Sequence, residues 1–312
     1  MAFGAGFWYG ANTGIGLHTT RGFGSMTDNH PDNEAIKTRQ RSDWNAVSGG
    51  WEKWWSTLEE GAHHVSERMM DLAQLQENHR VLDIATGIGE PALSAARRVG
   101  PDGHVLAIDQ APQMLDIAAK RAREAGLEHL TFRELDGESL QGINGQFDTV
   151  LCRWGLMFFP ALDIALKNIN QQLIRGGRFA AAVWSTPDKV PSISLSMNVV
   201  REMLDVPPPP PGTPNPFVLS NTDSLIQAFQ VAGFQNVRCE SIEVVFSIPS
   251  AEAYTEFTRD ISAPVVALVS GEDEDTQETV WNALTQAARS YETEDGSIRM
   301  VNEAFVICGS HE

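Results

Sequence analysis

The sequence predicts an α/β protein, with a doubly wound and mostly parallel β-sheet covered by helices on both faces. Short apolar runs around Leu82, Val105, Leu130 and Val150 are separated by helix-length segments, and this alternation is typical of βαβ units. The first run also leads through a glycine turn into a helix, at residues 81–92. With 312 residues, of which 42% are hydrophobic, the chain is long enough to bury a large core.

Two segments precede the first strand. Residues 1–30 contain seven glycines before Met26 and show no periodicity, so we expect this N-terminal segment to be disordered. Residues 31–78 have a helical pattern, which we expect to be interrupted near Ser48-Gly49-Gly50.

Tryptophans are concentrated in this helical segment. Four of the eight in the chain fall within twelve residues, and the last three have the i, i+3, i+4 spacing of one helix face: Trp44, Trp51, Trp54 and Trp55. Two interpretations are open. The helix packs on the core as an ordinary amphipathic helix, or it forms an aromatic lid over a ligand site.

Residues 81–92 have the pattern of a nucleotide-binding corner. The strand ends in Asp83, and Gly87 and Gly89 follow, where backbone can approach a ligand because no Cβ is in the way. Pro91 then suits the first turn of a helix. We expect that helix to end at Val99, before the turn Gly100-Pro101-Asp102-Gly103.

Two nucleotide classes fit this corner. Gly87-x-Gly89-x-x-Ala92, with Asp109 twenty residues after Gly89, matches the dinucleotide fingerprint. However, the carboxylates of Glu90 and Asp83 would repel an anionic pyrophosphate. S-adenosylmethionine (SAM) carries a sulfonium and an ammonium, which carboxylates attract. Electrostatics therefore favour SAM, although Glu90 could instead compensate the helix dipole and Asp83 could cap the loop.

The segments downstream of this corner extend the pattern. In order, the motifs are Asp83 to Pro91, His104 to Asp109, Asp136-Gly137, Phe147 to Trp154 and Leu173 to Phe179. With these five motifs, residues 81–179 resemble the class I SAM-dependent methyltransferases, most of all the branch of quinone-biosynthesis and natural-product enzymes. Ala85 replaces the commoner first glycine of the first motif. The resemblance implies a Rossmann-like, seven-stranded sheet with an antiparallel last strand, an N-terminal helical lid and helical cap insertions.

The resemblance also implies SAM as the cofactor and identifies residues that would bind it. Asp109 would bind the ribose hydroxyls, and residues 110–114 would border the adenine. Asp136 and the backbone N–H of Gly137 would hold the adenine edge. The predicted cofactor site therefore consists of Asp83, Gly87, Gly89, Asp109, Gln110, Met114, Asp136, Gly137 and Arg153.

Candidates for the acceptor pocket and for catalysis are fewer. Arg153 and Trp154 follow the fourth strand, at the sheet edge where ligands bind in open α/β folds. Arg153 would contact an anionic acceptor or the SAM carboxylate, or else form a surface ion pair. Trp154 and Phe158 would line the pocket together with the aromatic lid. His63 and His64 are the histidines nearest the lid, so they are candidates for a general base, the alternative being ordinary surface residues.

The C-terminal part is less regular. Residues 79–184 form the expected SAM-binding core, and 185–220 are a proline-rich connector or cap with too many prolines for a helix or central strand. Residues 221–312 return to the core. There we expect a helix over 221–233, strands over 237–248 and 301–309, and a helical cap insertion over 249–300.

Net charge, the length of apolar stretches and cysteine spacing argue against several classes of function. The net charge of −18 argues against nucleic-acid partners, which need a basic face. No apolar stretch approaches the roughly 20 residues that span a bilayer and no secretory signal is evident, so we expect a cytoplasmic protein. The cysteines, Cys152, Cys239 and Cys308, are odd in number and lack metal-ligand spacing, so we expect no metal site and buried thiols at Cys152 and Cys308.

The sequence as a whole predicts a SAM-dependent methyltransferase that acts on a small hydrophobic or aromatic acceptor. Whether oxygen, carbon or nitrogen is methylated is open at this point. Two alternatives are kept: an NAD(P)-dependent oxidoreductase, and a non-catalytic regulator that binds SAM.

Overall fold

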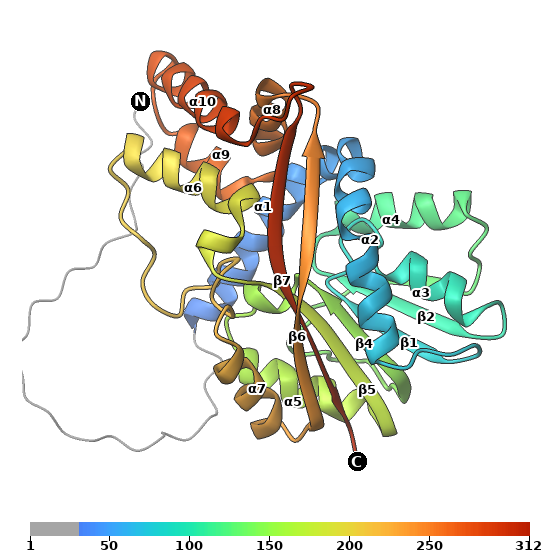
Figure 1. Cartoon of the computed structure of the whole chain (residues 1–312). Coiled ribbons are helices and arrows are strands. Elements are labelled where there is room, and N and C mark those ends of the chain that lie inside the picture. The colour runs from blue at the N-terminus through green and yellow to red at the C-terminus, as the bar shows by residue number, and fades with distance from the viewer. Residues whose placement is uncertain (1–30) are drawn as a thin grey trace, which may run out of the picture.

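The computed structural model describes residues 31–312, so the segment expected to be disordered, 1–30, lies outside the described residues. The fold is a seven-stranded sheet in the order β3-β2-β1-β4-β5-β7-β6, with helices on both faces (Figure 1). Strands β1 to β5 are parallel, and β7 runs antiparallel to both of its neighbours. The predicted doubly wound α/β fold is confirmed.

The strands coincide with the predicted apolar runs. Their bounds are β1 (Arg80–Ile84), β2 (His104–Asp109), β3 (Leu130–Glu134), β4 (Phe147–Arg153), β5 (Leu173–Trp184), β6 (Gln235–Ile248) and β7 (Ile298–Ser310). The last strand in sequence, β7, lies between β5 and β6, which leaves β6 at the edge of the sheet. The thiols of Cys152 on β4 and Cys308 on β7 are buried and free, as expected.

Two hydrophobic clusters fix the helices to the sheet. On one face, α3 (Ala92–Val99) and α2 (Trp55–Leu72) contribute to the larger cluster, next to α4 (Pro112–Glu124). On the other face, α5 (Leu162–Gln172) and α7 (Thr222–Val231) pack over the sheet (Figure 1). Helix α7 begins as predicted, because the Asn221 side chain accepts a hydrogen bond from the Ser224 N–H at 2.9 Å.

The predicted interruption at Ser48-Gly49-Gly50 is wrong. Helix α1 (Pro31–Lys53) continues through these residues, and the chain changes direction at Trp54, before α2. Gly50 serves packing instead: a Cβ there would lie 2.0 Å from the carbonyl oxygen of Asp260. The glycine therefore allows α1 to approach the C-terminal insertion closely.

The proline-rich segment also contains a helix that the sequence did not predict. The 3₁₀ turn η2 (Pro187–Lys189) leads into α6 (Pro191–Met203), because Pro191 occupies the first helical position and the proline run starts only at residue 207. The insertion 249–300 is helical as predicted, with α8 (Ala251–Ile261), α9 (Ala263–Val269) and α10 (Glu274–Ala288). These helices and α6 form a cap that also contacts α1 (Figure 1).

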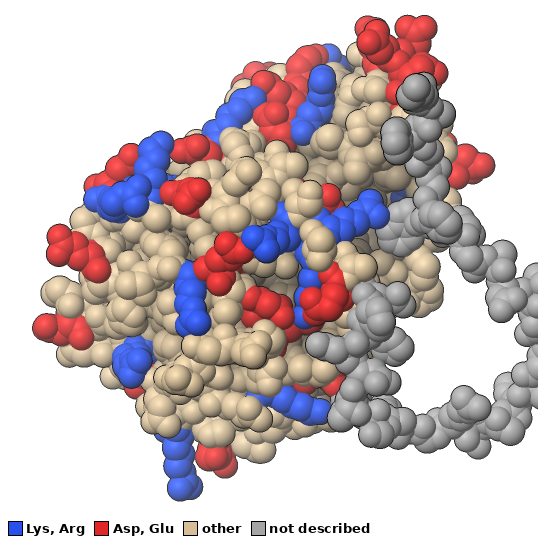
Figure 2. Space-filling view, turned by 180° about the vertical axis from the view of Figure 1, so that it is seen from behind, with Lys and Arg blue, Asp and Glu red and all other residues tan. Residues whose placement is uncertain are grey.

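Charged side chains are spread over the surface. On the face shown in Figure 2, the lysines and arginines lie among aspartates and glutamates and form no continuous basic stripe. Within residues 31–312, no helix has the length and apolar character required to cross a membrane.

Candidate functional site

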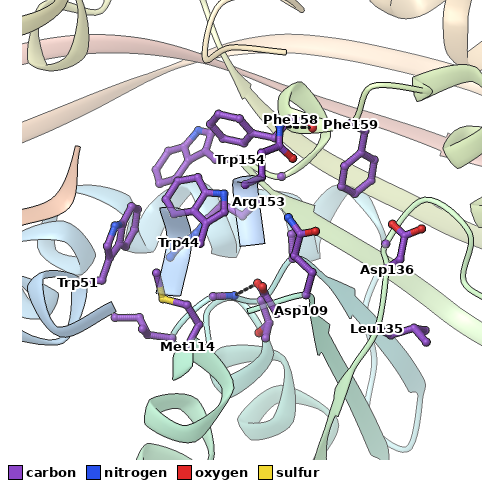
Figure 3. Close-up of a pocket in the computed structure, with 18 of the residues that line it drawn as sticks. Trp44, Trp51, Asp109, Met114, Leu135, Asp136, Arg153, Trp154, Phe158 and Phe159 are labelled. Carbon is purple, nitrogen blue, oxygen red and sulfur yellow. Dashed lines mark hydrogen bonds between the residues drawn. The ribbon is translucent and has the colours of Figure 1, made fainter. Parts of the chain in front are cut away.

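A pocket lies where β1, β2 and β4 end, beneath the lid helices α1 and α2 (Figure 3). Its cavity volume is about 130 Å³. Lining residues come from both lid helices, from the loops after β1, β2 and β3, and from the segment after β4 that includes the 3₁₀ turn η1 (Leu156–Phe158). This is the edge of the sheet at which open α/β folds bind ligands.

The glycine turn after β1 is joined to β2 through Asp109. The backbone of Gly87 is left-handed, with φ at +55°, and its N–H donates to the Asp109 carboxylate at 2.9 Å (Figure 3). A second backbone donor, the N–H of Ala111, lies 2.9 Å from the same carboxylate. Burial raises the pKa of Asp109, and these backbone donors partly oppose the rise. Asp109 and Gly87 therefore line the pocket as one fixed unit.

Two residues of the predicted cofactor site do not line the pocket. Asp83 is completely buried behind the turn, where its carboxylate accepts the Ala92 N–H at 3.1 Å, and burial raises its pKa to about 7. Gly89 faces Leu93, whose side chain would lie 2.9 Å from a Cβ at this position. In this structure Asp83 caps the start of α3 and Gly89 lets that helix pack, so contact of either residue with the cofactor stays a prediction.

Glu90 lies both at the start of helix α3, where it can compensate the helix dipole, and in the pocket wall, where it can face a ligand. Its carboxylate accepts the Ser94 N–H at 3.2 Å in the first turn of α3, yet the residue also lines the pocket. Burial, together with the negative charge of Glu59, raises the pKa of Glu90. A pyrophosphate placed at this helix end would meet a buried carboxylate, whereas a cationic group would be attracted.

A further part of the pocket wall is formed by the loops that follow β2 and β3. Gln110, Met114, Asp136 and Gly137 line it, and Figure 3 labels Met114 and Asp136 there. One oxygen of Asp136 accepts the Glu138 N–H at 3.0 Å. Gly137 is needed for close packing, because a Cβ there would lie 2.8 Å from the Phe159 ring.

Arg153 lines the pocket at the end of β4 and is not a surface residue. Its guanidinium donates to Glu59 at 3.1 Å and to the Ser66 hydroxyl at 2.8 Å, and only 9% of its side chain is exposed. The next residue, Trp154, has a positive φ of 58° and stacks on Trp184 with ring centroids 4.4 Å apart. The predicted ion pair therefore exists, but it is buried beside the pocket.

The aromatic side chains divide between the pocket and the cap. Trp44 and Trp51 of α1 line the pocket, with Trp55 of α2, and Trp44 contacts Phe158 edge to face at 5.3 Å (Figure 3). Trp54 instead packs on Phe257 and donates to Asp260 at 2.8 Å. The predicted common face is wrong for Trp54, because the helix breaks at this residue.

The two histidine candidates lie outside the pocket. The side chain of His63 is 59% exposed and 3.8 Å from Glu59, and Nε2 of His64 contacts the Glu243 carbonyl at 2.5 Å. Both residues are on the side of α2 opposite its buried residues. Neither histidine lines the pocket, so a role as general base is unsupported by this geometry and stays a prediction. Within residues 31–312, no group of three His, Cys, Asp or Glu side chains is placed to hold a metal ion.

Several lining residues were missed by the sequence analysis. They include Lys37, Gln40, Leu58, Glu138 and Phe159. A signal for the first two was present, because positions 37, 40, 44 and 51 recur at helical spacing and thus share a face of α1. Glu138 follows the Asp136-Gly137 motif directly, but its side chain direction depends on the loop.

Known methyltransferases are similar to this chain in sequence. A methyltransferase domain family matches residues 75–204. A demethylmenaquinone methyltransferase of Thermus thermophilus is 37% identical over 122 residues, 39% of this chain and 54% of that protein. Aklanonic acid methyltransferase DauC of Streptomyces sp. strain C5 is 34% identical over 116 residues, 37% of this chain and 53% of that protein. The matches thus span about half the length of either relative.

A solved structure extends the likeness of the fold beyond this core. YcgJ of Bacillus subtilis superposes with a TM-score of 0.51 at 21% identity, covering 80% of this chain and 99% of that protein. The matched domain, residues 75–204, contains β1 to β5 and the pocket segments after them. Residues 75–204 thus form a SAM-dependent methyltransferase domain, similar to enzymes of quinone biosynthesis and of natural-product synthesis.

Proposed function

We propose that this protein is a SAM-dependent methyltransferase that acts on a small, apolar or aromatic acceptor. The observation that carries the proposal is the division of the pocket into two parts. Carboxylates and backbone groups line the part at the ends of β1, β2 and β3, and aromatic rings line the part beneath the lid. The first suits a cofactor with a cationic and a nucleoside end, and the second suits a flat apolar molecule.

The residues of the first part have distinct roles in this proposal. Asp109 accepts hydrogen bonds from ribose hydroxyls, and Asp136 with Gly137 holds the adenine edge. The Glu90 carboxylate attracts the cationic amino-acid end of SAM, whereas it would repel the pyrophosphate of a dinucleotide. When bound, SAM supplies a methyl group that is already activated by the sulfonium.

The residues of the second part position the acceptor. Holding the acceptor atom in line with the methyl group provides much of the acceleration in such a transfer. Trp44, Trp51 and Trp55 exclude water and tolerate the positive charge near their rings. Because no histidine is among the lining residues, we infer an acceptor atom that loses its proton readily or carries none.

Two related proteins support the acceptor class without fixing it. These relatives are a demethylmenaquinone methyltransferase and an aklanonic acid methyltransferase. We propose an acceptor of similar size and flatness. Which atom is methylated is to be read from the product.

The cofactor is tested by calorimetric titration with S-adenosylhomocysteine (SAH), with NADH in parallel. We expect micromolar binding of SAH and none of NADH. Binding of NADH alone would mean that the electrostatic argument at Glu90 is wrong. Methyl transfer from labelled SAM to a panel of phenols and quinols then tests catalysis; SAH binding without transfer to any acceptor would favour a SAM-binding regulator.

A further inference from the structure

The two halves of helix α1 are attached to the protein differently. Residues 33–46 include no buried side chain, and the first buried residue of the helix is Val47. The second half packs on the cap, where Gly50 lies against the backbone of Asp260 and Lys53 pairs with Asp260 at 2.6 Å and Glu256 at 2.7 Å. Segments that bury little apolar surface open at low free-energy cost. Apart from Trp44, which packs on Phe158, the first half of α1 makes few apolar contacts with the core and is thus the part able to move.

Polar contacts hold this first half over the pocket. Gln40 donates to the Phe158 carbonyl at 3.0 Å, and Arg41 pairs with Glu134. Lys37 also extends from α1 toward the pocket carboxylates: its ammonium lies 3.0 Å from the Asp136 carboxylate and 2.5 Å from that of Glu138. The side chains of Lys37 and Glu138 are only 13% and 4% exposed. Their ion pair is therefore screened less by solvent than a surface pair.

With Lys37 in this position, the pocket is small and its carboxylates are occupied. A cavity of about 130 Å³ is well below the roughly 300–1,000 Å³ of pockets that enclose drug-sized ligands. Lys37, Gln40 and Trp44 all project into it from α1. Entry of a nucleoside therefore requires that the first half of α1 move away and that Lys37 release Asp136.

We propose that Lys37 is an autoinhibitory latch, which holds residues 33–46 of α1 closed over the pocket by pairing with Asp136 and Glu138. The latch regulates the same site that we propose to bind SAM, so this part rests on the proposed function. In the closed state Lys37 occupies the carboxylate that would hold the adenine edge. Only the open fraction of molecules accepts the cofactor, and the ion pairs determine that fraction.

The test combines hydrogen exchange with stopped-flow binding of SAH, followed by the fluorescence of the pocket tryptophans. In Lys37→Met, which keeps most of the apolar stem but not the charge, we expect faster exchange in residues 33–44 and SAH association about three- to tenfold faster than in the wild type. Glu138→Gln keeps an oxygen for the Ala161 N–H, which now donates to Glu138 at 2.6 Å, and is expected to act in the same direction.

A matched control is available at the other end of α1. Lys120 pairs with Glu52 at 3.0 Å, so Lys120→Met also removes an ion pair between α1 and the core, but outside the pocket. We expect this variant to behave as the wild type. Unchanged exchange and association in Lys37→Met, or equal acceleration in Lys120→Met, would overturn the latch. Absence of SAH binding in every variant would instead refute the proposed function, while the exchange data would still decide whether Lys37 holds the helix closed.

Discussion

Asp83 and Asp109 both stand at the ends of parallel strands, yet their carboxyl groups have different surroundings. Asp109 accepts two backbone N–H groups and lines the pocket, whereas Asp83 is enclosed beneath the turn with one oxygen that has no hydrogen-bond partner. At the scale of single residues, the sequence places both at the correct edge of the sheet. It does not distinguish the carboxylate that faces a ligand from the one that supports the turn, because this depends on how the turn packs.

Asp83 gives a prediction about pH and stability. Its pKa of about 7 in the folded protein exceeds the ordinary value of 3.8, so folding favours the protonated form. The contribution to stability is full below about pH 4, decreases as the pH rises, and is lost above about pH 7; at most it amounts to about 4 kcal/mol. Asp83→Asn cannot ionise, so we expect it to be more stable than the wild type at pH 8 and to lose this advantage at pH 4. Urea unfolding at both pH values measures the difference, and an equal gap at the two would contradict the assignment.

Asp109 gives a prediction about cofactor affinity. Asp109→Ala removes the acceptor proposed for the ribose and leaves the N–H groups of Gly87 and Ala111 without their partner. We expect SAH binding to weaken by about 1.5–3 kcal/mol, as for the loss of a hydrogen bond to a charged group. Asp116→Ala, on the exposed side of α4, is the control and should bind SAH as the wild type does. Calorimetry that finds equal affinities for both variants would refute the ribose assignment.

Among the helices and strands, the sequence predicted the buried, apolar elements more accurately than the others. Strands β1, β2, β3 and β4 are apolar and regularly spaced, so their positions were predictable. The break at Trp54 was not, because glycines usually mark breaks and here Gly50 marks a contact between helices. Helix α6 was missed because the proline run dominated the composition of its neighbourhood. In each error, a tertiary contact or a local boundary outweighed the composition of the segment.

The junction of α1 and α8 can be tested with two adjacent glycines. Gly50→Ala would place a Cβ 2.0 Å from the Asp260 carbonyl oxygen, whereas a Cβ at Gly49 has no atom within 4 Å. We expect Gly50→Ala to destabilise the protein by about 1–3 kcal/mol, because the helices must separate. Gly49→Ala should stabilise it by about 0.5–1 kcal/mol through helix propensity. Denaturant unfolding measures the free energy of unfolding of both variants. A change of the same sign in both would contradict the packing role of Gly50.

At the scale of the whole molecule, the C-terminal cap and the pocket are linked through the lid. None of the residues lining the pocket belongs to α6, α8, α9 or α10, so these cap helices lie outside the pocket wall. It contacts the lid where α1 meets α2, between Trp51 and Trp55, which do line the pocket. The sequence predicted lid and cap as separate parts, and only the fold shows that one supports the other.

Asp260 is the residue through which this support can be measured. It accepts hydrogen bonds from Lys53 and from the Trp54 indole, so it fixes the junction of the two lid helices. In Asp260→Ala, the junction loosens and Trp51 and Trp55 lose their fixed positions. We therefore expect the SAH dissociation constant to rise about three- to tenfold, although no atom of α8 lines the pocket.

Glu256 offers the comparison that separates this effect from a loss of surface charge. It pairs with the same lysine, but its side chain is 59% exposed and the Trp54 indole donates its hydrogen bond to Asp260 instead. A surface pair of this kind contributes little, so Glu256→Ala should bind SAH as the wild type does. If both variants bind SAH with wild-type affinity, the cap does not position the lid. If both weaken it equally, charge rather than the fixed junction controls binding. Weakening in Asp260→Ala alone is the result that the contact at Trp54 predicts.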